Sequence, residues 1–327
     1  MTAAIRFEDF VLEFGHGASA VRALDGVTLA VPDGCLLGIV GESGSGKSTA
    51  AFAAGRLMPQ GVGPKSGRLT VLGRDVWNLP IADLRQMRIH DLRYIFQDPI
   101  ATLDPTKKIG WQIREAAVGG ASPEDVKAAL RDVGMNDPDR VAASWPHELS
   151  GGMAQRAVIA MALIARPRII IADEATSALD ASVRTRILEL LRDASRDRGI
   201  TLILVSHDLW AVRKFCDRIA VMYGGRVVED GPADRVFGQP AHPYTRALLA
   251  ATVGQEARGD RLATIPGIPP LLHGACPGCA FAPRCDHAQL GLCDTQRPQT
   301  EDVEEGWHLL CHRWQDIRRK GISHGAD

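Results

Sequence analysis

Apolar positions along this chain follow strand-like patterns in several places. Residues 5–14 and 21–31 show partial apolar alternation with a glycine-rich break between them, which predicts an antiparallel strand pair whose first strand is a sheet edge. Short, nearly continuous apolar runs predict strands buried on both faces of a parallel sheet, at 35–40, 168–172 and 200–205. Two further strands are expected, at 68–76 and 93–96.

Helical patterns separate these runs. We expect a helix at 47–58, ending near Pro59, and an amphipathic helix at 181–198. The apolar period is helical through 106–165, where Ser122 precedes a proline and two acidic residues, the features of a helix N-terminus. Apolar strands that alternate with helices predict an α/β fold built on a parallel sheet.

A change of composition marks the C-terminal part of the chain. Beyond about residue 237 proline, glycine and cysteine become frequent, and a linker is expected at 267–270. We therefore predict a main domain over 1–236, with a helical subdomain at about 98–165, and a C-terminal extension over 237–327.

Composition excludes several classes of protein. The 327 residues carry 38 Lys and Arg against 39 Asp and Glu, so neither a highly charged disordered chain nor a basic nucleic-acid-coating protein is expected. The longest apolar stretch, 157–165, is far shorter than the roughly 20 residues of a membrane-spanning helix. The first ten residues carry charges and no signal-peptide core, so a soluble or peripheral protein without disulfides is predicted.

A glycine-rich loop follows the first buried strand. It matches the phosphate-loop pattern G-x-x-x-x-G-K-[ST] with residues Gly41, Glu42, Ser43, Gly44, Ser45, Gly46, Lys47, Ser48 and Thr49. A strand before the loop and a helix after it are the context that this pattern needs, because the backbone N–H groups and the helix N-terminus then face the phosphates. Lys47 is expected to meet the β- and γ-phosphates, and the Ser48 hydroxyl to bind Mg²⁺.

Two carboxylates end the second buried strand. Asp173 and Glu174 stand where ligands bind in an open α/β sheet, at the carboxyl end of a strand. Asp173 can hold Mg²⁺, and Glu174 can polarise the water that attacks the γ-phosphate. Taken alone, the pair also fits two solvated acids at a strand end, but the phosphate loop favours the catalytic interpretation.

Together with further segments, these motifs resemble the ATP-binding subunits of ABC transporters. Leu149-Ser150-Gly151-Gly152-Met153 resembles that family's signature motif, Gln97 its Q-loop glutamine, Ser177-Ala178-Leu179-Asp180 its D-loop, His207 its switch histidine and Phe14 its adenine-stacking aromatic. The motifs stand in the family's order. The resemblance implies a P-loop NTPase fold of the ABC ATPase type: a parallel core sheet, an antiparallel β subdomain, a helical insert and a small Cys-rich C-terminal domain.

The resemblance also implies roles for single residues. Catalytic roles fall to Glu174, His207 and Lys47, and Mg²⁺ contacts to Ser48, Gln97 and Asp173. ATP contacts fall to Phe14, Gly41, Ser43, Gly44, Ser45, Gly46, Lys47, Ser48, Thr49, Gln97, Ser150, Gly151, Gly152 and Asp180. In this family each ATP lies between one subunit's phosphate loop and its partner's signature. Without the neighbouring motifs, His207 would be taken as a structural histidine and Gln97 as a surface amide, and Phe14 also fits a core aromatic.

Three segments resemble, more narrowly, the dipeptide, oligopeptide and nickel importer ATPases: 146–153, 241–246 and 265–270. An ATP-hydrolysing importer subunit is implied, at the cytoplasmic face of the inner membrane, with peptides as the first expectation for the cargo. Its partners would be a second, paralogous ATPase subunit, two transmembrane permease subunits and an external solute-binding protein, and no nucleic acid. A nickel, metallophore or oligosaccharide importer is the alternative within the family; a non-transport ABC ATPase of DNA repair or translation is the alternative outside it.

Five of the seven cysteines crowd into the C-terminal extension. Four of them, Cys279, Cys285, Cys293 and Cys311, resemble a motif of these importers that can hold a [4Fe-4S] cluster. Zinc is an alternative, because Cys276 and Cys279 form a C-x2-C pair with His287, His308 and His312 nearby, and a site without metal is also open. Cys276 has no assigned role, and Cys35 and Cys216 are expected to be small core residues.

Overall fold

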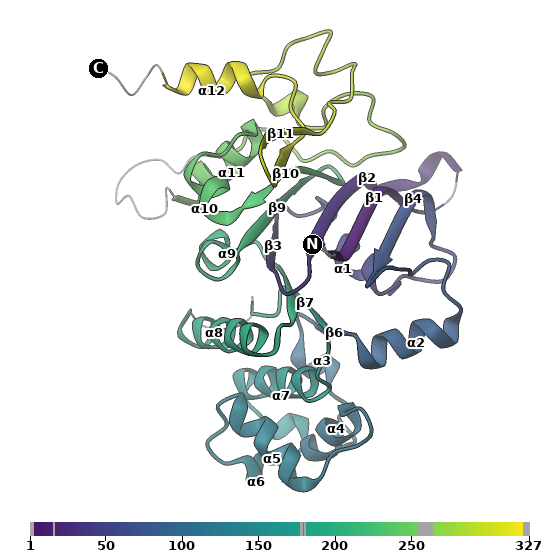
Figure 1. The fold of residues 1–327 in the computed structure, drawn as a ribbon, viewed down its shortest axis with the longest axis vertical. Coiled ribbons are helices and arrows are strands. Elements are labelled where there is room, and N and C mark those ends of the chain that lie inside the picture. Colours follow the sequence, from purple (N-terminus) through teal and green to yellow (C-terminus); the bar gives the residue numbers. More distant parts are fainter. Residues whose placement is uncertain (1–2, 16, 177–178, 180, 254–263, 323–327) are drawn as a thin grey trace. The chain divides into compact units, whose positions relative to one another are not determined.

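The computed structural model in Figure 1 describes residues 3–15, 17–176, 179, 181–253 and 264–322. The chain divides into two compact units. The first unit consists of Met1–Ala4, Pro32–Leu36 and Asn78–Ser206, and the second of Ile5–Val31, Leu37–Trp77 and His207–Asp327. Among the described residues, no helix has the length and apolar character needed to cross a membrane.

Parallel strands form the core of the first unit. They are β8 (Thr201–Val205), β7 (Ile169–Asp173) and β6 (Leu92–Ile95), in that order, each parallel to its neighbour. Every residue of β7 and β8 is buried, as expected of apolar runs covered on both faces. The strand expected at 93–96 begins one residue earlier and is only half-buried, because β6 has β7 on one side only within this unit.

Helices make up the rest of the first unit. They are α2 (Ile81–His90), α3 (Pro99–Thr102), α4 (Ile109–Ala116), α5 (Pro123–Asp132), α6 (Pro138–Ala143), α7 (Gly151–Ile164) and α8 (Ala181–Arg198), with a 3-10 turn η2 (Pro146–Glu148). Figure 1 shows α4 to α7 gathered into one bundle, as the helical period at 106–165 predicts. The Ser122 N-cap is confirmed, since its hydroxyl accepts from Asp125 N–H and the Asp125 carboxylate accepts from Ser122 N–H. Helix α2 was not predicted, because it buries only Leu84 and Met87.

A mainly antiparallel sheet opens the second unit, with strands in the order β2 (Val21–Pro32), β1 (Ala3–Phe14), β4 (Pro64–Val71) and β5 (Arg74–Asp75). The expected edge position of β1 is wrong, because β4 pairs with it opposite β2. The single strand expected at 68–76 is a hairpin of β4 and β5 instead. Leu72 and Gly73 turn the chain between them, with φ values of 50° and 76°.

A second sheet of this unit has the order β11 (Glu301–Glu304), β12 (Trp307–Leu309), β10 (Arg226–Pro232), β9 (Arg218–Tyr223) and β3 (Leu36–Val40). Strand β3 is parallel to β9, and the other pairs are antiparallel. The helices are α1 (Lys47–Ala54), α9 (Leu209–Phe215), α10 (Ala233–Gly238), α11 (Pro243–Val253) and α12 (Trp314–Ile322), with 3-10 turns η1 (Gly17–Ser19) and η3 (Ala282–Arg284). The helix expected at 47–58 ends earlier, because Gly55 caps α1.

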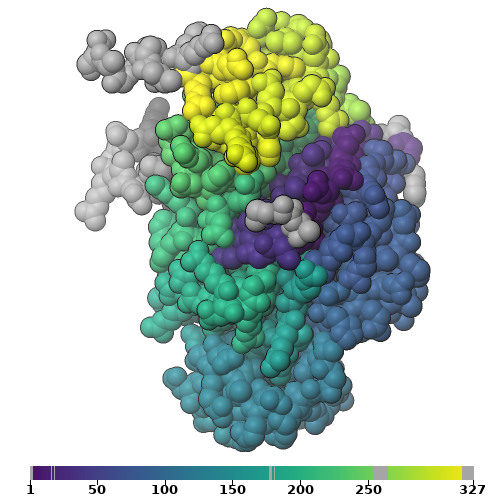
Figure 2. All heavy atoms as spheres, in the orientation of Figure 1, coloured from purple at the N-terminus to yellow at the C-terminus, as the bar shows by residue number. Residues whose placement is uncertain are grey.

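The C-terminal segment folds back onto the strands of this unit. Residues 264–322 form one continuous surface in Figure 2, drawn yellow-green to yellow. Arg297 anchors this segment to the first sheet by donating to the carbonyl of Asp25 at 2.8 Å. Strand β12 anchors it to the second sheet by pairing with β10, and Trp307 on β12 is fully buried.

Candidate functional site

The phosphate-loop segment joins β3 to α1 and folds so tightly that two of its positions accept only glycine. Gly41 and Gly46 have φ values of 149° and 100°. A Cβ atom on Gly41 would lie 2.2 Å from the Met222 carbonyl oxygen, and one on Gly46 would lie 2.7 Å from the Ala23 carbonyl oxygen. The glycines thus serve both the conformation and the packing of the loop, as a phosphate cradle requires.

Two polar residues of this loop, Ser45 and Lys47, are buried. The Lys47 ammonium donates to the carbonyls of Gly41 and Glu42, both at 2.9 Å, and only 7% of the residue is exposed. The Ser45 hydroxyl is buried and has no hydrogen-bond partner among the described residues. A buried hydroxyl without a partner and a lysine bent over its own loop are features that fit a phosphate group.

The remaining predicted residues of the second unit differ in their exposure. Ser48 and Thr49 are half-buried in the first turn of α1, Ser43 and Gly44 are exposed, and Phe14 is half-buried at the end of β1. His207 is exposed, one residue before the Asp208 N-cap of α9.

The two predicted carboxylates lie at the carboxyl end of β7. Asp173 is the last residue of the strand and 8% exposed. Glu174 follows with a φ of 46°, a left-handed conformation that is uncommon for this residue type, and its N–H donates to the Val205 carbonyl at 3.0 Å. A strained residue held by a neighbouring strand is typical of functional sites.

The signature residues open α7 in the first unit. The Ser150 hydroxyl caps the helix by accepting from Met153 N–H at 3.4 Å. No atom of the described residues lies within 4 Å of where a Cβ on Gly151 would be, so the helix N-terminus there can receive a ligand. Gln97 is exposed between β6 and α3. The predicted D-loop residues Ser177, Ala178 and Asp180 lie outside the described residues.

The predicted site residues therefore belong to two groups. The phosphate loop, Phe14 and His207 lie in the second unit. Gln97, Asp173, Glu174 and the signature lie in the first.

Sequence reasoning missed how the phosphate loop is held. Glu42, a variable position of the motif, donates its N–H to the Tyr244 hydroxyl at 2.8 Å. Its carboxylate accepts two bonds from Arg284, at 2.7 and 3.1 Å. Tyr244 lies in the segment 241–246, and Arg284 directly precedes Cys285; nothing in their sequence indicates this contact.

The four cysteines expected to hold a cluster line one small cavity. Cys279, Cys285, Cys293 and Cys311 surround it together with His287 and His312, and all four thiols are free. Burial raises the pKa of Cys279 to about 11 and that of Cys311 to about 12, and neighbouring thiols add to both shifts. Among the described residues, no group of three or more His, Cys, Asp or Glu side chains is arranged to hold a metal ion.

The other cysteines and the third histidine stand apart from this cavity. Cys276 is not among its lining residues, and its thiol donates to the Gly278 carbonyl at 3.5 Å. His308 pairs with Asp302 instead of facing the cavity. Cys35 and Cys216 are half-buried, so the expectation of core residues holds only in part.

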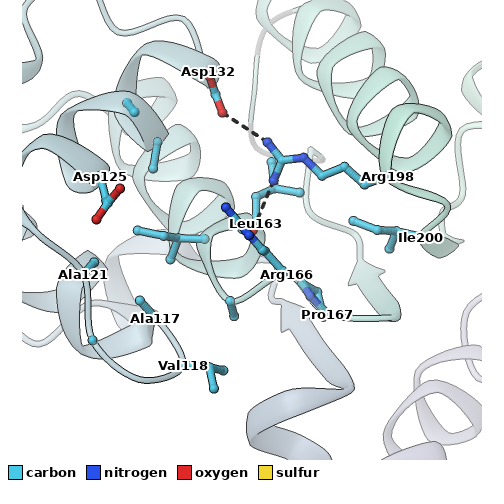
Figure 3. Close-up of a pocket in the computed structure, with 15 residues that line it drawn as sticks. Ala117, Val118, Ala121, Asp125, Asp132, Leu163, Arg166, Pro167, Arg198 and Ile200 are labelled. Atoms are coloured by element: carbon cyan, nitrogen blue, oxygen red, sulfur yellow. Dashed lines mark hydrogen bonds and ion pairs between the residues drawn. The ribbon is translucent and has the colours of Figure 1, made fainter.

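The first unit also contains an open pocket of about 810 Å³. Figure 3 shows Arg198 donating to the Asp132 carboxylate and to the Leu163 carbonyl at its rim. Pro167 and Ile200 line it just before β7 and β8 begin, so it lies at the amino ends of these strands. Ligands of open α/β sheets bind at the carboxyl ends, where Asp173 lies; the pocket is thus separate from the predicted ATP site.

Comparison with known proteins gives consistent matches. The family described as ABC transporter matches residues 24–177, and that described as oligopeptide/dipeptide transporter, C-terminal region, matches residues 228–293. OppD, the oligopeptide transport ATP-binding protein of Escherichia coli K12, is 39% identical over 305 residues, covering 91% of this chain and 90% of OppD. OppD of Salmonella typhimurium is 39% identical over 300 residues, 90% and 89% of the two chains. A solved dimeric ATP-binding cassette, in a post-hydrolysis state with ADP and Pi, matches with a TM-score of 0.63 and 27% identity over 70% of this chain and 98% of that one.

Proposed function

Since this chain belongs to the ATP-binding proteins of oligopeptide and dipeptide ABC transporters, we propose that it hydrolyses ATP to power the import of short peptides. The observation that carries the proposal is the similarity to OppD, which extends over nine-tenths of both chains and includes the C-terminal region. The ATP-binding cassette accounts for the hydrolysis, and the C-terminal region supports the peptide cargo.

In the proposed mechanism the phosphate loop binds the nucleotide. Its glycines expose backbone N–H groups and the N-terminus of α1 to the phosphates, while Phe14 stacks on the adenine. Lys47 leaves the carbonyls of Gly41 and Glu42 and turns to the β- and γ-phosphates. The Ser45 hydroxyl has no partner in the described part of the chain, which supports this assignment, because a phosphate oxygen would give it an acceptor.

Hydrolysis is assigned to the end of β7 and to His207. Bound Mg²⁺ would neutralise phosphate charge, and Ser48, Gln97 and Asp173 would hold it. Glu174 would orient and polarise the attacking water, and His207 would contact the γ-phosphate. The left-handed backbone of Glu174, fixed by its bond to Val205, supports a defined direction for its carboxylate.

The signature requires a second subunit. The open N-terminus of α7 at Gly151 supports a second phosphate contact, and a head-to-tail dimer would bring it to the partner's ATP. We propose that the partner is a paralogous ATPase subunit. Permease subunits and an external solute-binding protein complete the importer, with this chain at the cytoplasmic face of the membrane. Ile100 and Trp111 are large apolar residues left 46% and 41% exposed shortly after Gln97, which supports permease docking there.

Peptide uptake by cells that lack this chain tests the function. The unchanged chain is expected to restore uptake of labelled di- and oligopeptides. The Glu174→Gln variant should bind ATP, stay in a closed dimer, lose about 100-fold or more in ATP turnover, and fail to restore uptake, because the amide cannot polarise the water. Turnover and nucleotide binding are measured on the purified transporter.

Lys47→Ala is the comparison variant for this test, since it should weaken nucleotide binding itself and form no closed dimer. Unchanged turnover in Glu174→Gln would remove Glu174 from its role. Restored uptake of nickel but not of peptides would contradict the proposed cargo.

For the C-terminal extension, over 237–327, we propose a small Cys-rich domain with a [4Fe-4S] cluster. Four free thiols that line one cavity support it. Four thiolates around one zinc ion would lie only about 3.8 Å apart, whereas in a cluster each binds a different iron and the thiols are more widely spaced.

Anaerobic purification followed by iron, sulfide and zinc analysis tests the cluster. About four iron and four sulfide ions per chain are expected. Cys293→Ser should lose them, because Cys293 lines the cavity, whereas the matched variant Cys276→Ser should keep them. A colourless, zinc-loaded protein, or iron lost on changing Cys276, would overturn the assignment.

A further inference from the structure

Two C-terminal side chains hold one residue of the phosphate loop from both its main chain and its side chain. Tyr244 accepts from the Glu42 N–H at 2.8 Å, and Arg284 makes a two-point ion pair with the Glu42 carboxylate. The carbonyl of the same residue accepts from Lys47 at 2.9 Å. Glu42 thus connects both C-terminal side chains to one of the two carbonyls that bind the loop lysine.

Arg284 is held in place by several contacts besides those to Glu42. Its guanidinium donates to the carbonyls of Pro266 and Ile265, at 2.7 and 3.1 Å, and to the Tyr223 hydroxyl at 3.1 Å. The side chain is 5% exposed, and the bonds to Glu42 raise the pKa of the guanidinium further. An ion pair this well enclosed and shared between rigid partners costs little entropy to maintain.

Tyr244 is equally constrained. Its ring packs against Tyr223 and Phe281, with centroid distances of 4.5 and 5.3 Å, and the residue is fully buried. Its own N–H donates to His242 Nδ1 at 3.0 Å, and the buried Glu229 carboxylate accepts from the N–H of His242 at 2.9 Å. The hydroxyl is therefore presented to Glu42 by a packed framework.

We propose that Tyr244, Arg284 and Glu42 form a clamp that positions the phosphate loop for ATP, so that the C-terminal extension sets the affinity of the nucleotide site. The three residues are positioning residues, and the inference rests on the assignment of 41–49 as the nucleotide loop. A loop held in its binding shape pays less ordering entropy when the phosphates arrive. Because Cys285 follows Arg284 directly, the clamp also joins the cysteine cavity to the ATP site.

Three variants of the full-length chain test the clamp, with Mg-ATP as the probe. Tyr244→Phe removes only the acceptor hydroxyl, Glu42→Gln only the charge, and Arg284→Met the two-point donor. Each is expected to raise the Kd and the KM for Mg-ATP about five- to tenfold while kcat changes less than twofold, since the clamp orders the loop before binding. The double variant Glu42→Gln with Arg284→Met should bind Mg-ATP no more weakly than either single variant, because both substitutions break the same contact.

Arg218→Met is the matched control: it breaks the ion pair of Arg218 with Asp230, 2.9 Å long and in the same unit, without touching the loop. It should lower the melting temperature but leave Kd and KM unchanged. The clamp is refuted if Tyr244→Phe and Glu42→Gln keep Kd within twofold of the unchanged chain, or if the double variant shows full additivity. If Lys47→Ala also leaves the Kd unchanged, the assignment of the nucleotide loop itself fails.

Discussion

His242 is a fully buried histidine whose Nδ1 accepts a hydrogen bond from the Tyr244 N–H. Burial lowers its pKa to about 3, against the effect of a backbone hydrogen bond at Leu310 that favours the charged form. The ring is therefore neutral in the folded protein at any pH near neutrality, as an acceptor at Nδ1 requires.

Acid should destabilise the protein through this residue. The unfolded chain takes up a proton below about pH 6.5 and the folded one only near pH 3, so stability is lost as the pH falls between these values. In His242→Asn, whose amide oxygen can still accept from Tyr244, this loss should be absent. The difference in the free energy of unfolding between the two proteins should change by about 2 to 3 kcal/mol between pH 7 and pH 4.5, measured by urea titration.

Burial raises the pKa of the Glu229 carboxyl group, so this group makes the folded state more stable as the pH falls, opposite to His242. Glu229 is present in both proteins, so its contribution cancels when their free energies of unfolding are compared. Parallel pH curves for the unchanged chain and His242→Asn would contradict the neutral, buried histidine.

Glu174 shows the limit of sequence reasoning at this scale. Its identity and place after an apolar strand were enough to propose a catalytic carboxylate. Its left-handed backbone was not predictable, because residues with positive φ are normally glycine, asparagine or aspartate, and the bond to Val205 that holds it comes from another strand.

At the scale of elements, a buried ion pair joins the two sheets of the second unit. Arg226 on β10 donates to the Asp25 carboxylate on β2 from two nitrogens, at 2.9 and 2.6 Å, and both side chains are almost fully buried. The same guanidinium donates to the carbonyls of Cys276 and Gly278, each at 2.8 Å. One side chain thus ties two sheets and the segment that leads to the cysteine cavity.

Arg226→Met should therefore destabilise the fold by about 3 to 5 kcal/mol, because it leaves a buried carboxylate with less compensation and two carbonyls without their donor. Arg68→Met is the control: its ion pair with Asp75 is partly exposed, with 58% of the arginine side chain accessible, and its loss should cost under about 1 kcal/mol. Chemical unfolding of both variants measures the difference. Equal losses in the free energy of unfolding would show that burial does not set the strength of the Arg226 ion pair.

Elements with a strong local pattern were predicted closely, and elements defined by turns were not. Helix α8 and strands β7 and β8 agree with prediction to within one residue, since an apolar run or a helical period specifies them locally. The single strand predicted at 68–76 is wrong, because Leu72 and Gly73 both adopt positive φ and turn the chain there, and only the glycine is a typical turn residue.

At the scale of the whole molecule, the near-balance of 38 basic and 39 acidic residues agrees with how the site meets its ligand. In the proposed site, backbone N–H groups and Lys47 meet the phosphates, and no broad basic surface is needed. Arginines such as Arg226 and Arg284 instead form ion pairs within the protein, with Asp25 and Glu42.

Local patterns of neighbouring residues were enough to predict the parallel core, the phosphate loop with Lys47 and the carboxylates Asp173 and Glu174, and the resemblance to ABC ATPases added the signature at Ser150. The tertiary structure was needed to show that Tyr244 and Arg284 hold Glu42, and that Arg226 joins Asp25 to the carbonyl of Cys276. These contacts join residues up to 242 positions apart, and nothing in a local pattern specifies which distant side chain will meet a loop. The path of the chain through the sheets of the second unit brings them together.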